Sequence, residues 1–142
     1  MAIRVGQINA HRPAAAVTNL ELIAREKGLD ILCLQEPFCY KGKVTGCNFQ
    51  TWQKSDLKTV RIRVAAVVNQ ERVEILLNVG NKNEHVMCFR VISGDLEFIV
   101  VNVYCQYSVP LERFLIRIER LINCFPTEKL LLTLDANAKS VL

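Results

Sequence analysis

The order of apolar and polar positions predicts a strand, a helix and a second strand at the start of the chain. Residues 3–9 largely alternate between apolar and polar side chains, as in a strand with one buried face. Residues 14–27 repeat apolar side chains at helical spacing, and Gly28 is suited to end that helix. Residues 30–34 form a continuous apolar run, which is typical of a strand that is buried on both faces.

The rest of the chain reads as several strands, a helix and a last strand. The predicted middle strands cover residues 63–69, 72–79, 85–92 and 96–104. Ser93-Gly94-Asp95 suits a hairpin turn between the last two. Residues 110–125 predict an amphipathic helix with a proline beside each end, and residues 129–134 predict a buried strand. The apolar face of that helix is expected to contain Leu111, Phe114, Leu115, Ile118, Leu121, Ile122 and Phe125.

Length and composition fit one folded domain over residues 1–142. Hydrophobic residues make up 51% of the chain and charged residues 23%, which argues against a disordered protein. No apolar run approaches the roughly 18–20 residues that span a bilayer. The first residues also lack the basic and then apolar pattern of a secretory signal, so we expect an intracellular protein.

The chain has six cysteines: Cys33, Cys39, Cys47, Cys88, Cys105 and Cys124. No two of them are spaced as C-x-x-C, and neither histidine stands at a zinc-like distance from them in the sequence. Cys33, Cys88 and Cys105 fall in or beside apolar runs, and Cys124 falls in the amphipathic helix. A reduced cysteine in such a place behaves as a small apolar residue, so we expect buried thiols rather than disulfides.

The net charge of +4 is unevenly distributed. Six basic residues and one acid stand between residues 37 and 63, so this segment carries +5 and the remainder of the chain carries −1. The six, interleaved with four aromatic residues, are Lys41, Lys43, Lys54, Lys58, Arg61 and Arg63. Such a segment can attract nucleic-acid phosphates and stack on bases. The alternative is a solvated loop whose aromatic residues anchor it to the core.

Four predicted strands end in polar residues. These ends are Asn9, Gln35-Glu36, Tyr104 and Asp135-Ala136-Asn137. Ligands in α/β folds gather at the carboxyl ends of strands, and Mg²⁺ prefers one or two carboxylates with water and phosphate oxygens. Taken singly, such residues are often turn caps or exposed strand ends, and a tyrosine is often part of the core. Their occurrence at four strand ends favours a catalytic site.

The first turn excludes two other nucleotide-binding folds. A dinucleotide-binding unit and a P-loop both need a glycine-rich turn after the first strand. The chain reads Asn9-Ala10-His11-Arg12-Pro13 at this point, without a glycine. The consecutive middle strands also argue against a simple alternating parallel sheet.

Four motifs resemble, in their order, those of the endonuclease/exonuclease/phosphatase superfamily: Gln7-Ile8-Asn9, Leu34-Gln35-Glu36, Val101-Asn102-Val103-Tyr104 and Asp135-Ala136-Asn137. Within this superfamily the chain looks most like the apurinic/apyrimidinic-type endonuclease domains of non-LTR retrotransposons. Residues 135–140 are similar to the site-specific clades of these elements. The resemblance implies an α/β fold of the DNase I-like kind, a two-sheet α/β sandwich with helices on its outer faces.

The resemblance also implies a role for each matching residue. Glu36 would bind Mg²⁺, or Mn²⁺, with Asn9 beside it. Asp135 would orient or deprotonate the attacking water, Asn137 would hold the scissile phosphate, and Tyr104 would contact the phosphate or the leaving group. The implied activity is a nick in double-stranded DNA whose 3′-hydroxyl primes reverse transcription. It implies work on chromosomal DNA in the nucleus and a reverse transcriptase domain on the same chain.

Members of this superfamily continue beyond the point that matches Leu142, with further strands and a late Asp-His pair. Neither His11 nor His85 stands in the context of that pair, and Leu134 replaces a glycine that is common in the superfamily. We therefore expect a domain that is incomplete at its C-terminus. Its open strand edges would make the isolated chain poorly stable or self-associating, and without the Asp-His pair it would be inactive alone.

Two alternatives stay open at this point. One is another member of the superfamily, either an abasic-site repair nuclease or a phosphatase that acts on a small substrate. The other is a catalytically dead fragment that still binds nucleic acid.

Overall fold

The computed structural model of the chain describes residues 2–11, 19–45, 52–56, 61–77 and 83–137. Its elements are β1 (Val5–Asn9), α2 (Leu20–Glu26), β2 (Ile31–Gln35), β3 (Cys39–Tyr40), β4 (Lys43–Val44), β5 (Trp52–Asp56), β6 (Val64–Asn69), β7 (Glu74–Leu77), β8 (Val86–Ser93), β9 (Leu96–Tyr104), α3 (Leu111–Asn123) and β10 (Leu130–Asp135). Each strand that the sequence pattern predicts has a counterpart among these elements. The short strands β3, β4 and β5 were missed, because they lie in the polar, basic segment, where the apolar alternation is weak.

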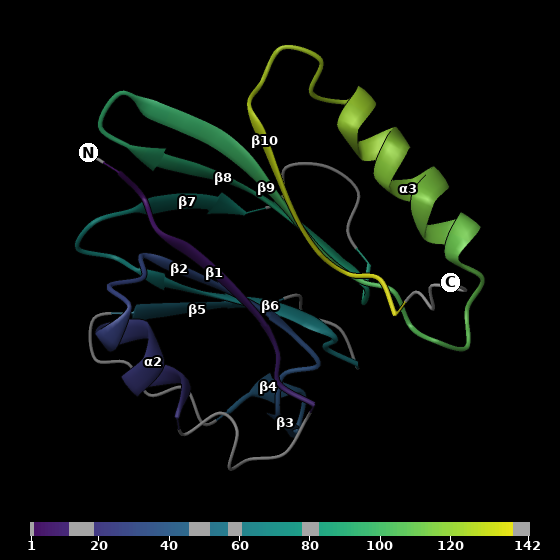
Figure 1. Ribbon diagram of the computed structural model, residues 1–142, viewed down its shortest axis with the longest axis horizontal. Coiled ribbons are helices and arrows are strands. Elements are labelled where there is room, and N and C mark those ends of the chain that lie inside the picture. The colour runs from purple at the N-terminus through teal and green to yellow at the C-terminus, as the bar shows by residue number, and fades with distance from the viewer. Residues whose placement is uncertain (1, 12–18, 46–51, 57–60, 78–82, 138–142) are drawn as a thin grey trace, which may run out of the picture.

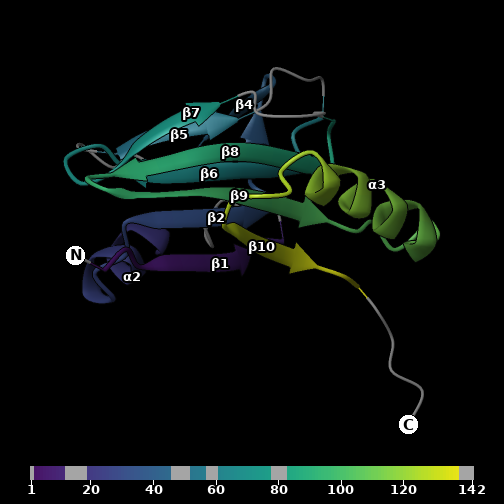
Figure 2. The same ribbon diagram turned by 90° about the horizontal axis from the view of Figure 1, so that it is seen from above.

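Two four-stranded sheets pack face to face, and a helix covers the outer face of each (Figure 1). The strand orders are β1-β2-β6-β5 and β10-β9-β8-β7. In each sheet the first pair is parallel and the remaining pairs are antiparallel. The strands run along the sandwich, with β1, β9 and β10 pointing toward the same end (Figure 2). This arrangement confirms the expected two-sheet sandwich.

Three apolar layers hold the sandwich together. The central layer lies between the sheets, where Ile31 and Ala66 of the first sheet pack with Phe89 and Val100 of the second. A second layer joins α2 to the first sheet, and a third joins α3 to the second sheet. Buried residues on both faces explain why β2 and β6 read as continuous apolar runs rather than as alternating ones.

The end of α2 and the turn of one hairpin follow the expected turn chemistry. Gly28 has a φ of +59° and closes α2, because a residue without a Cβ enters the left-handed region at little cost. Gly94 has a φ of +58° in the turn that joins β8 to β9.

On α3, Leu115 and Ile122 are about half exposed, although the periodicity places them on the apolar face. They lie at the rim of that face, beyond the reach of the sheet.

None of the described cysteines, Cys33, Cys39, Cys88, Cys105 and Cys124, forms a disulfide, as expected. Cys33, Cys88 and Cys105 are buried, as the apolar pattern predicts. The expectation is wrong for Cys124, which is exposed because it follows the last residue of α3 rather than facing the sheet. Cys47 lies outside the described residues. No helix in the described part of the chain is long and apolar enough to cross a membrane.

A buried amide joins the two sheets. Asn102 on β9 is fully buried and accepts hydrogen bonds at its Oδ1 from Gln35 Nε2 at 2.6 Å and from Thr133 Oγ1 at 3.1 Å. Its Nδ2 donates to the backbone oxygens of Leu34 at 3.1 Å and Ala65 at 3.0 Å. One side chain therefore connects β2, β6, β9 and β10. Removing it would leave several buried polar groups without partners.

Replacing Asn102 with alanine should lower the free energy of unfolding by on the order of 3 kcal/mol, because the amide and hydroxyl groups around it lose their partners. Asn123→Ala is the matched control, since Asn123 is exposed at the end of α3 and should change stability by less than about 0.5 kcal/mol. Urea unfolding followed by circular dichroism measures both. Equal unfolding midpoints for the two variants would contradict this role of Asn102.

The buried thiols should resist alkylation at pH 8. Burial raises the pKa of Cys33, Cys88 and Cys105 to about 11 in each case, so these groups stay protonated and are weak nucleophiles. Cys124 should therefore react with iodoacetamide in the folded protein, and the three buried thiols only after unfolding in urea. Mass spectrometry of proteolytic fragments gives the order. Rapid labelling of Cys33 in the folded state would contradict the packing described above.

Candidate active site

The predicted catalytic residues meet at one end of the sandwich. Asn9 and Tyr104 are the last residues of β1 and β9, Asp135 is the last residue of β10, and Glu36 follows β2 directly. Because β1 pairs in parallel with β2, and β9 with β10, the carboxyl ends of these strands lie side by side within each sheet. Contacts between the sheets then bring all four residues together, with Asn137 beside them.

The first of these contacts joins β1 to β10. Asn9 Nδ2 donates a hydrogen bond to Asp135 Oδ2 at 2.5 Å, across 126 positions of sequence. Asn9 Oδ1 accepts the backbone N–H of His11 at 2.8 Å, so the amide is held on both of its sides. The Asp135 carboxylate thereby acquires a fixed orientation from a residue of the opposite sheet.

The second contact joins β2 to β9. The Tyr104 hydroxyl donates to Glu36 Oε1 at 2.7 Å, and the Glu36 side chain is only 16% exposed. Glu36 itself has a φ of +47°, in the left-handed region that is costly for a residue with a Cβ. Its backbone N–H donates to the carbonyl of Arg63 at 2.8 Å, which holds this conformation. Strained non-glycine residues of this kind cluster at functional sites.

Asn137 completes the arrangement through the turn after β10. Its backbone N–H donates to Asp135 Oδ1 at 3.2 Å, and its Nδ2 donates to the carbonyl of Cys105 at 2.8 Å. Asn137 also has a positive φ, +45°, which asparagine tolerates better than most residues. One N–H of its amide remains available to a ligand, because only the other is used by Cys105. Both oxygens of Asp135 are therefore positioned, one by Asn9 and one by Asn137.

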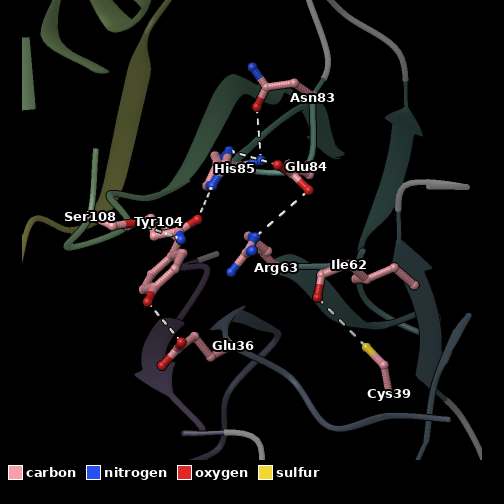
Figure 3. Close-up of polar contacts among 10 residues, drawn as sticks. Glu36, Cys39, Ile62, Arg63, Asn83, Glu84, His85, Tyr104 and Ser108 are labelled. Carbon is pink, nitrogen blue, oxygen red and sulfur yellow. Dashed lines mark hydrogen bonds and ion pairs between the residues drawn. The ribbon is translucent and has the colours of Figure 1, made fainter. Parts of the chain in front are cut away.

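Three charged or titratable residues that the motifs did not predict lie next to this cluster (Figure 3). His85 is buried, its ring stacks near that of Tyr104 with centroids 6.4 Å apart, and its carbonyl accepts the Tyr104 N–H at 2.9 Å. Glu84 lies 3.7 Å from His85 Nδ1 and 3.7 Å from Arg63 Nε. With the hydrogen bond between the backbones of Glu36 and Arg63, these contacts form a closed ring that passes through Tyr104 and Glu36.

The sequence contains little that would predict the positions of Arg63, Glu84 and His85 beside the site. Arg63 stands just before β6, and Glu84 and His85 stand just before β8, where a polar residue usually marks a turn. Arg63 was expected on the DNA-facing surface, and its burial at 8% exposure is a correction. It turns inward because Glu84 and the carboxyl end of β2 lie there.

His11 is a further neighbour of the site. Its ring is 78% exposed, and Nδ1 lies 3.8 Å from Glu36 Oε2, so a protonated His11 would pair with that carboxylate. Like Glu36, it has a positive φ, +50°. The turn without glycine after β1 thus places an imidazole at the edge of the candidate site.

The donor set suits a hard divalent cation better than a soft one. The site offers the carboxylates of Glu36 and Asp135 together with amide oxygens, which are the ligand types of Mg²⁺ sites that keep several waters. In the described part of the chain, no three His, Cys, Asp or Glu residues are grouped closely enough to hold a metal by themselves. The residues present therefore fit an ion held by one or two carboxylates, with water and phosphate as its other ligands.

An open pocket of about 540 Å³ adjoins this cluster. It is lined by the loop between β9 and α3, from Cys105 to Leu111, and by Ala136 and Asn137. Burial, and then the nearby Asp135 carboxylate, raise the pKa of Cys105 to about 11, so its thiol is neutral. The pocket provides room for a substrate next to Asn137.

The predicted basic segment is only partly described. Lys41, Lys43 and Arg61 are exposed, in agreement with a solvent-facing surface. The side chains of Lys54 and Lys58 lie outside the described residues. Arg61 and Arg63 line a second open pocket of about 610 Å³ with Phe38 and Cys39. Whether this surface contacts DNA stays a prediction.

No family model matches the sequence, and a search of the curated proteins finds no match. The structure is similar to the endonuclease domain of TRAS1, a telomere-specific non-LTR retrotransposon, with a TM-score of 0.82 and 22% sequence identity, over 98% of this chain and 61% of that one.

It is also similar to D. rerio TDP2 humanized by 14 mutations, with a TM-score of 0.71 and 8% identity over 97% of this chain and 63% of that one. A third similar structure is D. rerio TDP2 complexed with a single-strand DNA product, with a TM-score of 0.70 and 12% identity over 97% and 62%. The chain thus spans less than two thirds of the length of each of these three. These similarities, with the two-sheet architecture, show that the chain has a DNase I-like fold.

Proposed function

We propose that the protein is a divalent-metal-dependent DNA endonuclease that nicks a duplex by hydrolysis of a phosphodiester bond. The observation that carries the proposal is the hydrogen bond between Asn9 and Asp135, which links the two sheets at the end where Glu36, Tyr104 and Asn137 also lie. The similarity to the TRAS1 endonuclease domain supports it. The chain covers 61% of that domain, so the activity is proposed for the protein that contains this chain.

Asp135 is proposed to orient the attacking water and to accept its proton. Each of its oxygens already accepts one hydrogen bond, from Asn9 or Asn137, and each keeps a second lone pair. Water would attack phosphorus, and the bond from phosphorus to the 3′ oxygen would break. The products are a 5′-phosphate and a 3′-hydroxyl, and the leaving oxygen takes up a proton.

Asn137 and Tyr104 are proposed to hold the reacting phosphate. The remaining N–H of the Asn137 amide would donate a hydrogen bond to a phosphate oxygen. An amide makes this contact without adding charge to the site. The Tyr104 hydroxyl, which donates to Glu36 here, would contact the phosphate or the leaving group. Donors fixed before the reaction stabilise the developing charge without further reorganisation.

Glu36 is proposed to hold Mg²⁺, or Mn²⁺, with Asn9 beside it. When bound, such an ion supplies positive charge that offsets the negative charge growing on the phosphate oxygens and the leaving group. Glu36 is suited to this task because its carboxylate is largely buried and oriented by Tyr104.

In this proposal the nick serves a retrotransposon. Its 3′-hydroxyl would prime reverse transcription by a polymerase domain on the same polypeptide, acting on chromosomal DNA in the nucleus. The support is the sequence resemblance together with the likeness to the TRAS1 domain.

The activity should depend on both carboxylates. In a supercoiled-plasmid nicking assay with Mg²⁺, Glu36→Gln and Asp135→Asn should each lower the rate by at least about 100-fold, because each removes a charge that the reaction uses. Glu97→Gln is the matched control, since Glu97 is exposed near the opposite end of β9 and should nick at the parent rate. The assay compares the 142-residue chain with the longest natural form of the protein.

The outcomes of this assay separate the alternatives. Nicking that survives Glu36→Gln would contradict the proposed site. Cleavage of an abasic duplex in large excess over intact DNA would favour a repair nuclease, and release of phosphate from small esters alone would favour a phosphatase. Salt-sensitive DNA binding without nicking in either form of the protein would favour a binding role.

The Tyr104 hydroxyl should contribute to catalysis rather than to folding. Tyr104→Phe should lower kcat/KM for nicking by roughly 10- to 100-fold, because a hydrogen bond to a charged group is worth about 1.5–3 kcal/mol. It should also raise the Mg²⁺ concentration needed for half-maximal activity, since Glu36 loses the group that orients it. Tyr40→Phe, at an exposed tyrosine of β3, is the control. Unchanged nicking kinetics of the Tyr104→Phe variant would contradict a catalytic role of the Tyr104 hydroxyl.

A further inference from the structure

The exposed side of α3 carries three arginines on one face. Arg113, Arg117 and Arg120 follow one another at spacings of four and three residues, and all three are exposed. A helix with 3.6 residues per turn keeps such positions within about 60° of one another. The buried face of α3, with Phe114, Ile118 and Leu121, packs on the second sheet, so the arginines project to the side of the contact. We call these three residues the arginine face.

The arginine face borders two adjoining hollows of the surface. One has a volume of about 400 Å³ and is lined by all three arginines, and the other has a volume of about 300 Å³ and is lined by Arg113 and Arg117. Asn83, from the segment before β8, lines both. The arginines are therefore arranged along a shallow surface rather than isolated on a convex one.

The positive charge of this face is not neutralised nearby. Within the described residues, no carboxylate lies within ion-pair distance of these guanidinium groups. Glu112 and Glu119 of α3 lie about 100° or more around the helix from the centre of the face. Glu84, which lines the smaller hollow, lies 3.7 Å from both Arg63 and His85. Its charge is thus already opposed by Arg63.

The length of the arginine face is comparable to a few phosphate steps of duplex DNA. Arg113 and Arg120 are about 10 Å apart along the helix axis, at a rise of 1.5 Å per residue. One strand of duplex DNA advances about 3.4 Å along the duplex axis per phosphate, so α3 lying parallel to that axis would extend over about three phosphate steps. The planar guanidinium group is also the side chain that best matches two phosphate oxygens at once.

The arginine face is continuous with the candidate active site. His85 lines the smaller hollow together with Arg113 and Arg117, and its ring stacks near that of Tyr104. His85 Nε2 also lies 3.0 Å from Oε1 of Gln106, in the loop that leads from β9 to α3 and lines the pocket beside Asn137. Figure 1 shows that α3 begins at the same end of the sandwich as the carboxyl ends of β9 and β10. A strand bound at Tyr104 could thus extend along α3.

We propose that the arginine face binds the phosphodiester backbone of double-stranded DNA beyond the scissile bond. The identity of the polyanion rests on the proposed function, whereas the location of the surface rests on α3 itself. The arginine face positions the duplex and does not take part in the cleavage step. It also supplies a DNA-binding surface that is separate from the basic segment of residues 37–63.

The test measures binding of a fluorescein-labelled 30-base-pair duplex of mixed sequence by fluorescence anisotropy, in EDTA so that no cleavage occurs. The test variant carries Arg113→Gln, Arg117→Gln and Arg120→Gln in the longest natural form of the protein. The matched control carries Arg25→Gln, Lys27→Gln and Lys129→Gln, which removes the same charge from exposed positions near the starts of β2 and β10. Glutamine is a good helix former, and circular dichroism verifies that both variants fold.

We expect the arginine-face variant to bind about 10- to 100-fold more weakly than the parent at 0.1 M salt, and the control to stay within about threefold. The slope of log K against log salt should fall by about 2 to 3, because each lost phosphate contact removes about 0.9. Lysine at all three positions should restore most of that slope, since it retains the charge. Saturating DNA should restore kcat for nicking.

Equal losses in the test and control variants, or an unchanged salt slope, would overturn the proposal. So would a test variant that loses poly-glutamate binding but retains DNA binding, because the face would then recognise acidic protein. The proposed function can fail independently. If the arginine-face variant binds DNA more weakly but the protein never nicks DNA, the binding surface is supported and the proposed nuclease activity is contradicted. If the variant nicks and binds DNA normally, the nuclease activity is supported and the binding surface is contradicted.

Discussion

The geometry of this domain depends on one buried amide. Asn102 is buried between the two sheets and hydrogen bonds to side chains or carbonyls of β2, β6 and β10. An apolar side chain in its place could fill the volume but could not specify how far one sheet slides along the other. Buried polar groups that are fully paired fix a single arrangement, because any shift leaves some of them without partners. The register between the sheets is thus set close to the candidate site.

The period of two along β9 and β10 extends this effect to Tyr104 and Asp135. Gln35, Asn102 and Thr133 meet between the sheets. Tyr104 and Asp135 lie two residues further along β9 and β10, and Glu36 directly follows Gln35, just beyond the end of β2. Toward this end, the space between the sheets therefore changes from apolar packing to an amide layer and then to charged groups. The positive φ values of His11, Glu36 and Asn137 fall just beyond the strand ends. Each costs about 1–2 kcal/mol for an ordinary residue, which the packed sheets behind them can offset.

Charge is divided between a precise site and a broader surface. At the site, Glu36 and Asp135 have fixed hydrogen-bond partners, and Arg63 is drawn inward to Glu84. On α3, the arginines have no such partners among the described residues and face solvent beside two shallow hollows. Paired charges suit a reaction that needs exact orientation, whereas unpaired ones suit attraction of a long polyanion that screening by salt readily weakens. His85 lies between the two, because it lines the smaller hollow and its ring stacks near that of Tyr104.

The sequence alone determined the longer elements and the candidate catalytic residues. Buried strands show as apolar runs, α3 shows as an amphipathic repeat, and polar residues at strand ends mark Asn9, Glu36, Tyr104, Asp135 and Asn137, because these are local properties of the chain. Only the tertiary structure decided which of them touch. Asn9 meets Asp135 across 126 positions, and Arg63 turns inward while the arginines of α3 stay exposed. A side chain's partner depends on how two sheets pack, and no local pattern of residues contains that information.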